Sequence, residues 1–147
     1  MLKNLIELTK VRIGFLVLVT TVIGFYLGSQ GQIDLSLLLF TIVGTLLCST
    51  GSSVMNNVIE SETDKLMERT KNRVLPTQKI SLLSAKIIGF TFIISGLSIL
   101  NFKVNSTTCI LSLITIVSYL FLYTPLKRKS WLNTSIGAIP GALPPLG

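Results

Sequence analysis

The sequence predicts an all-α protein, a bundle of helices that cross a membrane. Of its 147 residues, 49% are hydrophobic and 13% are charged, and the mean hydropathy is +0.71. Soluble domains carry about twice that share of charged residues. Several apolar windows approach or reach the length of about 20 residues that crosses the hydrocarbon core of a bilayer. We therefore expect one polytopic transmembrane domain over residues 1–147, with four complete spans and the start of a fifth.

Short polar segments mark the ends of the expected spans. The first twelve residues are mildly amphipathic, and we expect them to lie in the membrane interface. A polar turn over 29–34 closes the first span, and Leu75 before Pro76 ends any helix that enters the following loop. The expected spans cover residues 13–28, 35–55, 80–100, 107–123 and 132–147, the last of them incomplete.

The later half of the second expected span is rich in small residues. Small residues let neighbouring helices approach closely, which is their commoner role in membrane proteins. They also leave room for an elongated apolar substrate, and the sequence leaves both explanations open. The residues concerned are Gly44, Ser49, Gly51, Ser52 and Ser53.

The formal net charge of +7 does not indicate a nucleic-acid partner. Lys and Arg fall in short loops between the apolar windows, as membrane orientation requires. Cys48 and Cys109 both lie inside apolar windows, so we expect buried thiols rather than a disulfide or a metal pair. The chain has no histidine, which removes the usual general base and the commonest metal and heme ligand.

The distribution of Lys and Arg predicts the orientation of the chain. Three lie in the N-terminal segment, five in the 60–79 loop and three in the 124–131 loop, whereas the 29–34 turn has none and the 101–106 turn has one. Cytoplasmic loops carry the excess of positive charge. We therefore expect the N-terminus and both charged loops on the cytoplasmic side, where the two loops can meet over one cavity.

The segment after the second span carries the strongest pattern in the chain. Residues 56–76 read NNVIESETDKLMERTKNRVLP and hold four of the six acidic residues. Residues four apart share one face of a helix. If a helix continues through this segment, an acceptor stripe contains Asn56, Glu60, Asp64 and Glu68, and a basic stripe beside it contains Lys65, Arg69 and Arg73.

Closely spaced acids repel one another unless a cation lies between them. Mg²⁺ is typically held by one or two carboxylates and by the phosphate oxygens of a substrate, so the stripe suits Mg²⁺ with a phosphate or diphosphate. Glu60 and Asp64 would hold the metal, with Asn56 in support. Arg69 and Arg73 would neutralise diphosphate oxygens. The competing interpretation is a solvated loop whose charges set topology and pair with one another.

A second charged loop follows the fourth span and reads YTPLKRKSW over residues 123–131. Here Tyr123 would donate a hydrogen bond to a diphosphate and Lys127 would neutralise its charge. The alternatives are an interfacial position for Tyr123 and a topology-setting role for Lys127. A neutralised diphosphate is a good leaving group, and an allylic chain in a water-poor cavity would then react as a carbocation with an electron-rich acceptor.

Both charged segments resemble motifs of the UbiA superfamily of intramembrane prenyltransferases. NNVIESETDKLMERTKNRVLP is similar to the superfamily's first Asp-rich motif, and is closest to the form found in heme O synthases (protoheme IX farnesyltransferases), NNYxDRDIDxxMxRTxxRxLP. YTPLKRKSWLNTSIGAIPGALPPLG is similar to YTPLKRxTxxNxxIGAIPGAxPPLxG of the same enzymes. The resemblance covers all 147 residues but only the first half of the family's fold.

The resemblance implies a bundle of nine transmembrane helices around one cavity, in the bacterial inner membrane. It implies Mg²⁺-dependent transfer of a farnesyl group from farnesyl diphosphate to a vinyl group of heme B, which gives heme O. By position, the metal–diphosphate motif and its basic continuation correspond to Asn56, Glu60, Asp64, Arg69 and Arg73, and the conserved loop with the expected catalytic residues corresponds to Tyr123 and Lys127.

Two departures from the family pattern affect these expectations. Glu60 and Glu62 stand where the family has Asp, and an extra methylene moves a carboxylate by about 1.5 Å, enough to disturb near-octahedral Mg²⁺ geometry. The family's second Asp-rich motif would lie beyond Gly147, and the last expected span has no polar flank. We therefore expect a C-terminally truncated domain that is inactive without the missing half.

Two other functions remain open. One is prenyl transfer to an aromatic or quinone precursor, although the segments MERTKNRVLP and IGAIPGALPPLG favour heme O synthesis. The other is a non-catalytic membrane protein in which the Glu replacements mark lost function. On the first interpretation the expected partners are farnesyl diphosphate, heme B and the lipid bilayer.

Overall fold

The computed structural model describes residues 2–126 and 133–146, and within these ranges all regular secondary structure is helical. This confirms the predicted all-α class. The elements are α1 (Leu2–Thr9), α2 (Val11–Gly28), α3 (Leu35–Asp64), α4 (Leu82–Ile99), the π-helix η1 (Leu100–Val104), α5 (Ser106–Val117), the π-helix η2 (Ser118–Tyr123), α6 (Thr124–Leu126), α7 (Asn133–Ala142) and the 3₁₀ turn η3 (Pro144–Leu146).

Several of these elements join into segments that can cross a membrane. The expected spans up to residue 123 lie largely within four such segments, the second of which continues well past the expected end at residue 55. The fifth expected span corresponds to α7 and η3, except for its first and last residues, which lie outside the described part of the chain. The segments that are long and apolar enough to cross are Val11–Gly28, Leu35–Asp64, Leu82–Val104 and Ser106–Leu126.

Polar residues in the turns start three of the helices. The Asp34 carboxylate accepts hydrogen bonds from the N–H groups of Ser36 and Leu37, at 2.8 and 3.1 Å, and so caps α3. Ser81 and Asn105 accept from backbone amides three residues later, at 3.0 and 2.7 Å, and cap α4 and α5. Such caps satisfy amides that have no partner inside the helix. The polar turns therefore both separate the apolar windows and begin the next helix.

The outer surface is apolar, while much of the interior is polar. Phe15, Leu27 and Phe102 are 64%, 71% and 79% exposed. In water this arrangement would be unfavourable, but lipid does not penalise exposed apolar side chains. It therefore supports placement of the bundle in a bilayer. The buried polar residues of α3 include Thr41, Thr45, Ser52, Ser53, Asn56 and Asn57.

Four glycines let the antiparallel helices α3 and α4 pack closely against each other. A Cβ atom on Gly51 would lie 2.8 Å from the carbonyl oxygen of Gly89. About two helical turns away, a Cβ on Gly96 would lie 2.7 Å from the carbonyl oxygen of Gly44. In both helices the glycines are seven residues apart, so they share one face. The packing explanation for the small residues is thus confirmed for Gly44 and Gly51.

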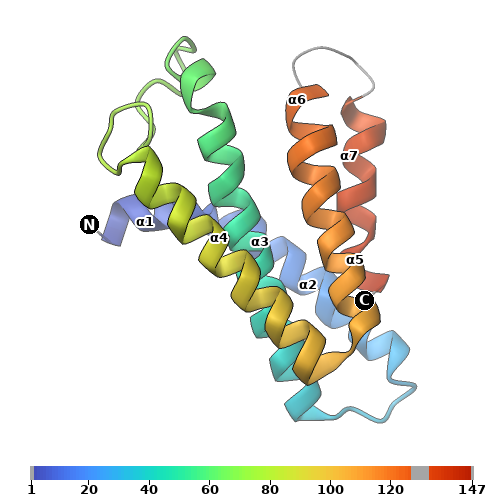
Figure 1. Cartoon of the computed structure of the whole chain (residues 1–147). Helices are drawn as coiled ribbons and strands as arrows, with labels where there is room; N and C mark the ends of the chain where they lie inside the picture. Colours follow the sequence, from blue (N-terminus) through green and yellow to red (C-terminus); the bar gives the residue numbers. More distant parts are fainter. Residues whose placement is uncertain (1, 127–132, 147) are drawn as a thin grey trace.

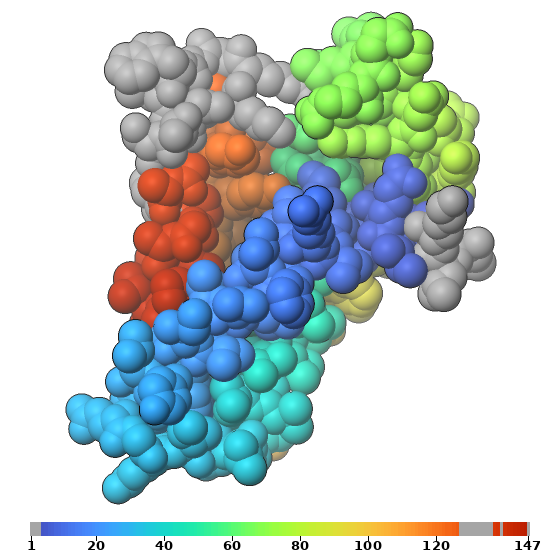
Figure 2. All heavy atoms as spheres, turned by 180° about the vertical axis from the view of Figure 1, so that it is seen from behind, coloured from blue at the N-terminus to red at the C-terminus, as the bar shows by residue number. Residues whose placement is uncertain are grey.

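The loops sort to two ends of the molecule (Figure 1). The end of α3, the start of α4 and the end of α6 lie at one end, and the α2–α3 and α4–α5 connections lie at the other. On the face seen in Figure 2, α2 lies next to the C-terminal segment, and it packs against both α3 and η3. The 65–81 loop and the end of α6 therefore lie at the same end of the molecule.

We predict that Gly96→Ala weakens the α3–α4 contact. The added Cβ would lie 2.7 Å from both Cys48 Sγ and the Gly44 carbonyl oxygen, and such overpacking costs about 1–3 kcal/mol. In detergent-solubilised protein that also carries Cys109→Ser, the temperature at which buried Cys48 reacts with a maleimide should fall by several degrees. Gly28→Ala is the matched control, because a Cβ there meets nothing within 4 Å. Equal transition temperatures for the two variants would contradict this packing.

Candidate active site

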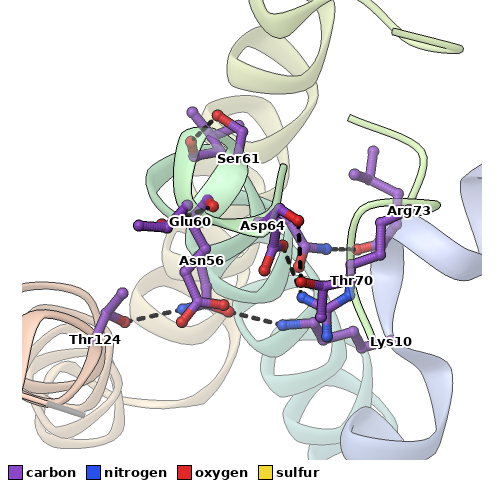
Figure 3. Close-up of polar contacts among 12 residues, drawn as sticks. Lys10, Asn56, Glu60, Ser61, Asp64, Thr70, Arg73 and Thr124 are labelled. Carbon is purple, nitrogen blue, oxygen red and sulfur yellow. Dashed lines mark hydrogen bonds and ion pairs between the residues drawn. The ribbon is translucent and has the colours of Figure 1, made fainter. Parts of the chain in front are cut away.

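The polar end of α3 carries the residues that the sequence pattern singles out. Because α3 is continuous to Asp64, Asn56, Glu60 and Asp64 lie on successive turns of one helix (Figure 3). Their exposed fractions are only 2%, 4% and 3%. Carboxylates in such surroundings are costly unless they have partners, and they usually mark a functional site. We refer to these three residues as the acceptor stripe.

The acceptor stripe is shorter than the sequence pattern indicated. Glu68 does not belong to it, because α3 ends at Asp64; the Glu68 side chain is 91% exposed and pairs with Lys71 at 2.7 Å. Thr70 Oγ1 donates a hydrogen bond of 3.1 Å to the Asp64 carbonyl oxygen. That oxygen would otherwise need an amide from a further turn of helix. The chain can therefore leave the helix at this point without losing a backbone hydrogen bond.

The predicted basic stripe of Lys65, Arg69 and Arg73 is wrong. No helix covers residues 65–81, all of which the structure describes, so the three side chains do not share a helical face. Arg73 instead returns to the end of α3, where its Nη1 lies 2.8 Å from Asp64 Oδ2. Attraction between an arginine and a buried carboxylate nine residues apart thus fixes the path of the chain. Helical periodicity contains no information about such a contact.

Both the oxygen and the nitrogen of the Asn56 side-chain amide make hydrogen bonds. Lys10 Nζ donates a hydrogen bond of 2.7 Å to Asn56 Oδ1, and Asn56 Nδ2 donates one of 3.0 Å to Thr124 Oγ1. Thr124 Oγ1 in turn donates to the carbonyl oxygen of Tyr119 at 2.8 Å. These contacts join the N-terminal segment, α3 and the η2–α6 segment (Figure 3). They fix the amide so that its oxygen faces a cation.

A cavity of about 1220 Å³ opens beside Asn56, between α2, α3, α5 and the C-terminal segment. At its polar end Lys10, Arg69 and Arg73 line the wall together with Asn56. These side chains come from the segment before α2, the end of α3 and the 65–81 loop. The charged segment over residues 56–76 and the N-terminal segment therefore contribute to one cavity, and the second charged segment contributes Tyr123 to it.

Small polar and aliphatic side chains line the rest of the cavity. Ser49, Ser52 and Ser53 of α3 face it, whereas the glycines of the same helix pack against α4. The small residues of α3 therefore serve packing on one face and line a cavity on another, and the elongated apolar substrate for that cavity stays a prediction. The aliphatic lining includes Ile13, Val17, Leu111, Ile116 and Leu143.

Direction along the acceptor stripe changes from one member to the next. Residues four apart differ by about 40° in direction, because each residue of an α-helix turns about 100°. Asp64 therefore points about 80° away from Asn56. Asp64 lines a second, smaller cavity of about 190 Å³ together with Lys10 and Arg73. Since Lys10 and Arg73 line both cavities, the same two cations serve both ends of the stripe.

Tyr123 lines the main cavity rather than only meeting lipid. Its ring stacks on that of Tyr119, with the centroids 5.6 Å apart and the planes inclined by 15°, and both residues line the cavity. On its other side it lies against Gly137 of α7, where an added Cβ would come within 2.9 Å of the Tyr123 ring. Lys127, the other expected catalytic residue, lies outside the described residues.

The donor set fits a divalent cation that is shared with a phosphate-bearing substrate. Among the residues that the structure describes, no three His, Cys, Asp or Glu side chains group closely enough to hold a metal by themselves. Glu60 and Asp64 supply two carboxylates, and Mg²⁺ usually takes one or two carboxylates and completes its shell with water and substrate phosphate oxygens. Lys10 and Arg73 line the smaller cavity together with Asp64, and their positive charges match that of a phosphate group.

Three residues of the site are absent from the sequence-based candidates: Lys10, Tyr119 and Thr124. Tyr119 is four residues before Tyr123, so helical spacing alone would have placed the two rings on one face. Thr124 lies within the YTPLKRK segment, between two residues that were singled out. The contact of Lys10 has no local signal, because 46 residues separate it from Asn56.

Comparison with known proteins agrees with this architecture. The sequence profile of the UbiA prenyltransferase family matches residues 17–147. A protoheme IX farnesyltransferase from Solibacter usitatus (strain Ellin6076) is 40% identical over 154 residues, which cover 99% of this chain and 53% of the relative. One from Aquifex aeolicus (strain VF5) is 42% identical over 146 residues, which cover 99% and 50%. The chain thus spans about half the length of these relatives.

A solved structure gives the same fold. A digeranylgeranylglyceryl phosphate synthase aligns with a TM-score of 0.78 and 24% identity, over 97% of this chain and 53% of that chain. Likeness at this identity concerns the fold alone. The four apolar helical segments of the described chain and the match to the family profile together indicate an integral membrane protein. Because the family profile matches most of the sequence, the chain belongs to the UbiA prenyltransferase family.

Proposed function

We propose that the protein containing this chain transfers a farnesyl group from farnesyl diphosphate to a vinyl group of heme B, giving heme O. The observation that carries the proposal is the buried acceptor stripe of α3, which begins with Asn56 at the polar end of a large cavity and ends with Asp64 at a smaller one, with Lys10 and Arg73 lining both. The relatives named protoheme IX farnesyltransferase support heme as the acceptor. The chain supplies one half of the enzyme, and a second half with a further Asp-rich motif completes it.

In this half of the enzyme, some residues would bind the metal and others would bind the diphosphate directly. Glu60 and Asp64 would hold Mg²⁺, with Asn56 in support. Bound there, the metal would withdraw charge from the diphosphate and make it a better leaving group. Arginine carries five N–H donors, so Arg73 can keep its bond to Asp64 and still donate to a phosphate oxygen. Arg69 lines the same wall and adds a second guanidinium.

The other expected residues act at the opposite side of the polar end. Tyr123 lines the cavity, where its hydroxyl would donate a hydrogen bond to the diphosphate. In this proposal Lys127 neutralises the leaving group as it departs. The aliphatic and small side chains deeper in the cavity would hold the isoprenoid chain and exclude water, which would otherwise capture the allylic cation.

Orientation in the membrane follows from the same arrangement. The 65–81 loop and the end of α6 lie at one end of the bundle (Figure 1), and hydrogen bonds attach the N-terminal segment to the part of α3 that leads to this end. We infer that this end faces the cytoplasm across a bacterial inner membrane, because these segments carry most of the Lys and Arg residues. Diphosphate would then enter from the aqueous side and its apolar tail from the bilayer.

The proposed activity can be tested in membranes from cells that express the full reading frame containing these residues. Heme B, farnesyl diphosphate and Mg²⁺ are supplied, and heme O is measured by mass spectrometry. We expect heme O to form, and its formation to stop when Mg²⁺ is chelated. An aromatic acid or a quinone precursor offered in place of heme should yield no prenylated product. Prenylation of such a precursor without heme O, or no product with any acceptor, would refute the proposal.

We predict that Asp64→Asn lowers the rate of farnesyl transfer in these membranes by about a hundred-fold or more, because it removes a charge that holds the metal. Higher Mg²⁺ concentrations should restore part of the rate if metal affinity is what was lost. Glu68→Gln is the matched control: it removes an acid of the same segment that is exposed and paired with Lys71. Unchanged turnover for Asp64→Asn would remove the metal assignment.

A further inference from the structure

Lys10 has an unusual backbone conformation between α1 and α2. Its φ and ψ angles are 49° and 50°, in the left-handed region that residues with a Cβ atom rarely adopt. Glycine would adopt this turn most easily. Gln30 and Gln78 also adopt positive φ angles in other turns, so the contacts of the Lys10 side chain, and not the turn alone, single out this position.

Contacts of Leu8, two residues before Lys10, hold this turn in place. Leu8 is 2% exposed and packs in a cluster with Val54 and Val58 of α3. Asn57 Nδ2 donates a hydrogen bond of 2.8 Å to the Leu8 carbonyl oxygen. The N-terminal segment is therefore attached to α3 directly beside the acceptor stripe, and Lys10 follows it immediately along the chain.

The Lys10 ammonium group lies at the start of the acceptor stripe. Its Nζ is 2.7 Å from Asn56 Oδ1, and Lys10 lines both the main cavity and the smaller one next to Asp64 and Arg73 (Figure 3). An ammonium group carries three N–H donors, so Lys10 can keep its bond to Asn56 and still donate to a phosphate oxygen in the cavity.

We propose that Lys10 is a further substrate-binding residue, which contacts the diphosphate group of the prenyl donor. It would add a cation from the N-terminal segment to the guanidinium groups of the 65–81 loop, so that the diphosphate is neutralised by two separate segments at the same end of the cavity. This inference rests on the proposed function, since it concerns the same site. It assigns a substrate contact to the turn between the first two helices.

The test compares three variants of Lys10 in the same membranes. Lys10→Met should raise the KM for farnesyl diphosphate by roughly 10- to 100-fold, the effect of losing one hydrogen bond to a charged group. The KM for heme should not change. Lys10→Arg should recover most of the affinity because it keeps the charge. Lys79→Met is the matched control, because Lys79 is exposed and lines neither cavity.

Lys10→Gly separates substrate binding from a structural role. Glycine keeps the left-handed turn, so the transition temperature in detergent should stay the same or rise, while the KM for farnesyl diphosphate rises as it does in Lys10→Met. A fall in stability for Lys10→Gly with an unchanged KM would overturn the proposal. A rise in the KM for heme alone in the Lys10 variants would also overturn the proposal.

A binding measurement distinguishes failure of this inference from failure of the proposed function. Binding of inorganic pyrophosphate in the presence of Mg²⁺ is measured by calorimetry on the purified protein. Tighter binding by the wild-type protein than by Lys10→Met supports the inference even if no heme O forms. Equal binding by the two proteins contradicts it even if heme O does form.

Discussion

The structure depends on the burial of two carboxylates at the end of one helix. Glu60 and Asp64 are almost completely shielded from solvent, at the boundary of a bundle whose outer surface is apolar. Charges in such positions are stable only with partners close by. Arg73 supplies one for Asp64, and Lys10 hydrogen-bonds to Asn56 one turn before Glu60. The need for these partners brings the N-terminal segment and the 65–81 loop to the end of α3.

The helices could be predicted from the sequence because their signals are local. Apolar windows gave the segments, and Asp34, Ser81 and Asn105 gave the points where three helices begin. The end of α3 could not be predicted in the same way. Residues 65–75 contain no proline or glycine that would break a helix, and the chain turns away because Thr70 and Arg73 both bond to Asp64. Such contacts depend on the folded chain, so local propensity does not reveal them.

Spacing along the helix predicted part of the site correctly. Asn56, Glu60 and Asp64 do lie on successive turns, because a four-residue interval is close to one helical turn. Four residues turn about 40° more than one full turn of helix. Over two such steps the difference is enough to place Asn56 on the large cavity and Asp64 on the smaller one. Contacts between segments far apart in the sequence, as between Lys10 and Asn56, have no counterpart in any periodic pattern.

The acidic side chains of the site are on a helix, whereas its basic side chains are in the connections between helices. Its carboxylates, which we propose as metal ligands, are on α3, a helix that is long and apolar enough to span a membrane and that packs closely on α4 through its glycines. Its cations, Lys10, Arg69 and Arg73, lie outside the apolar segments, in the connections between them. A metal ion requires ligands in fixed positions, and a helix supplies them. In the proposed reaction a diphosphate would arrive from water and would need neutralisation both on arrival and on departure. Cations at the aqueous end would reach it at a lower desolvation cost than cations placed within the bilayer.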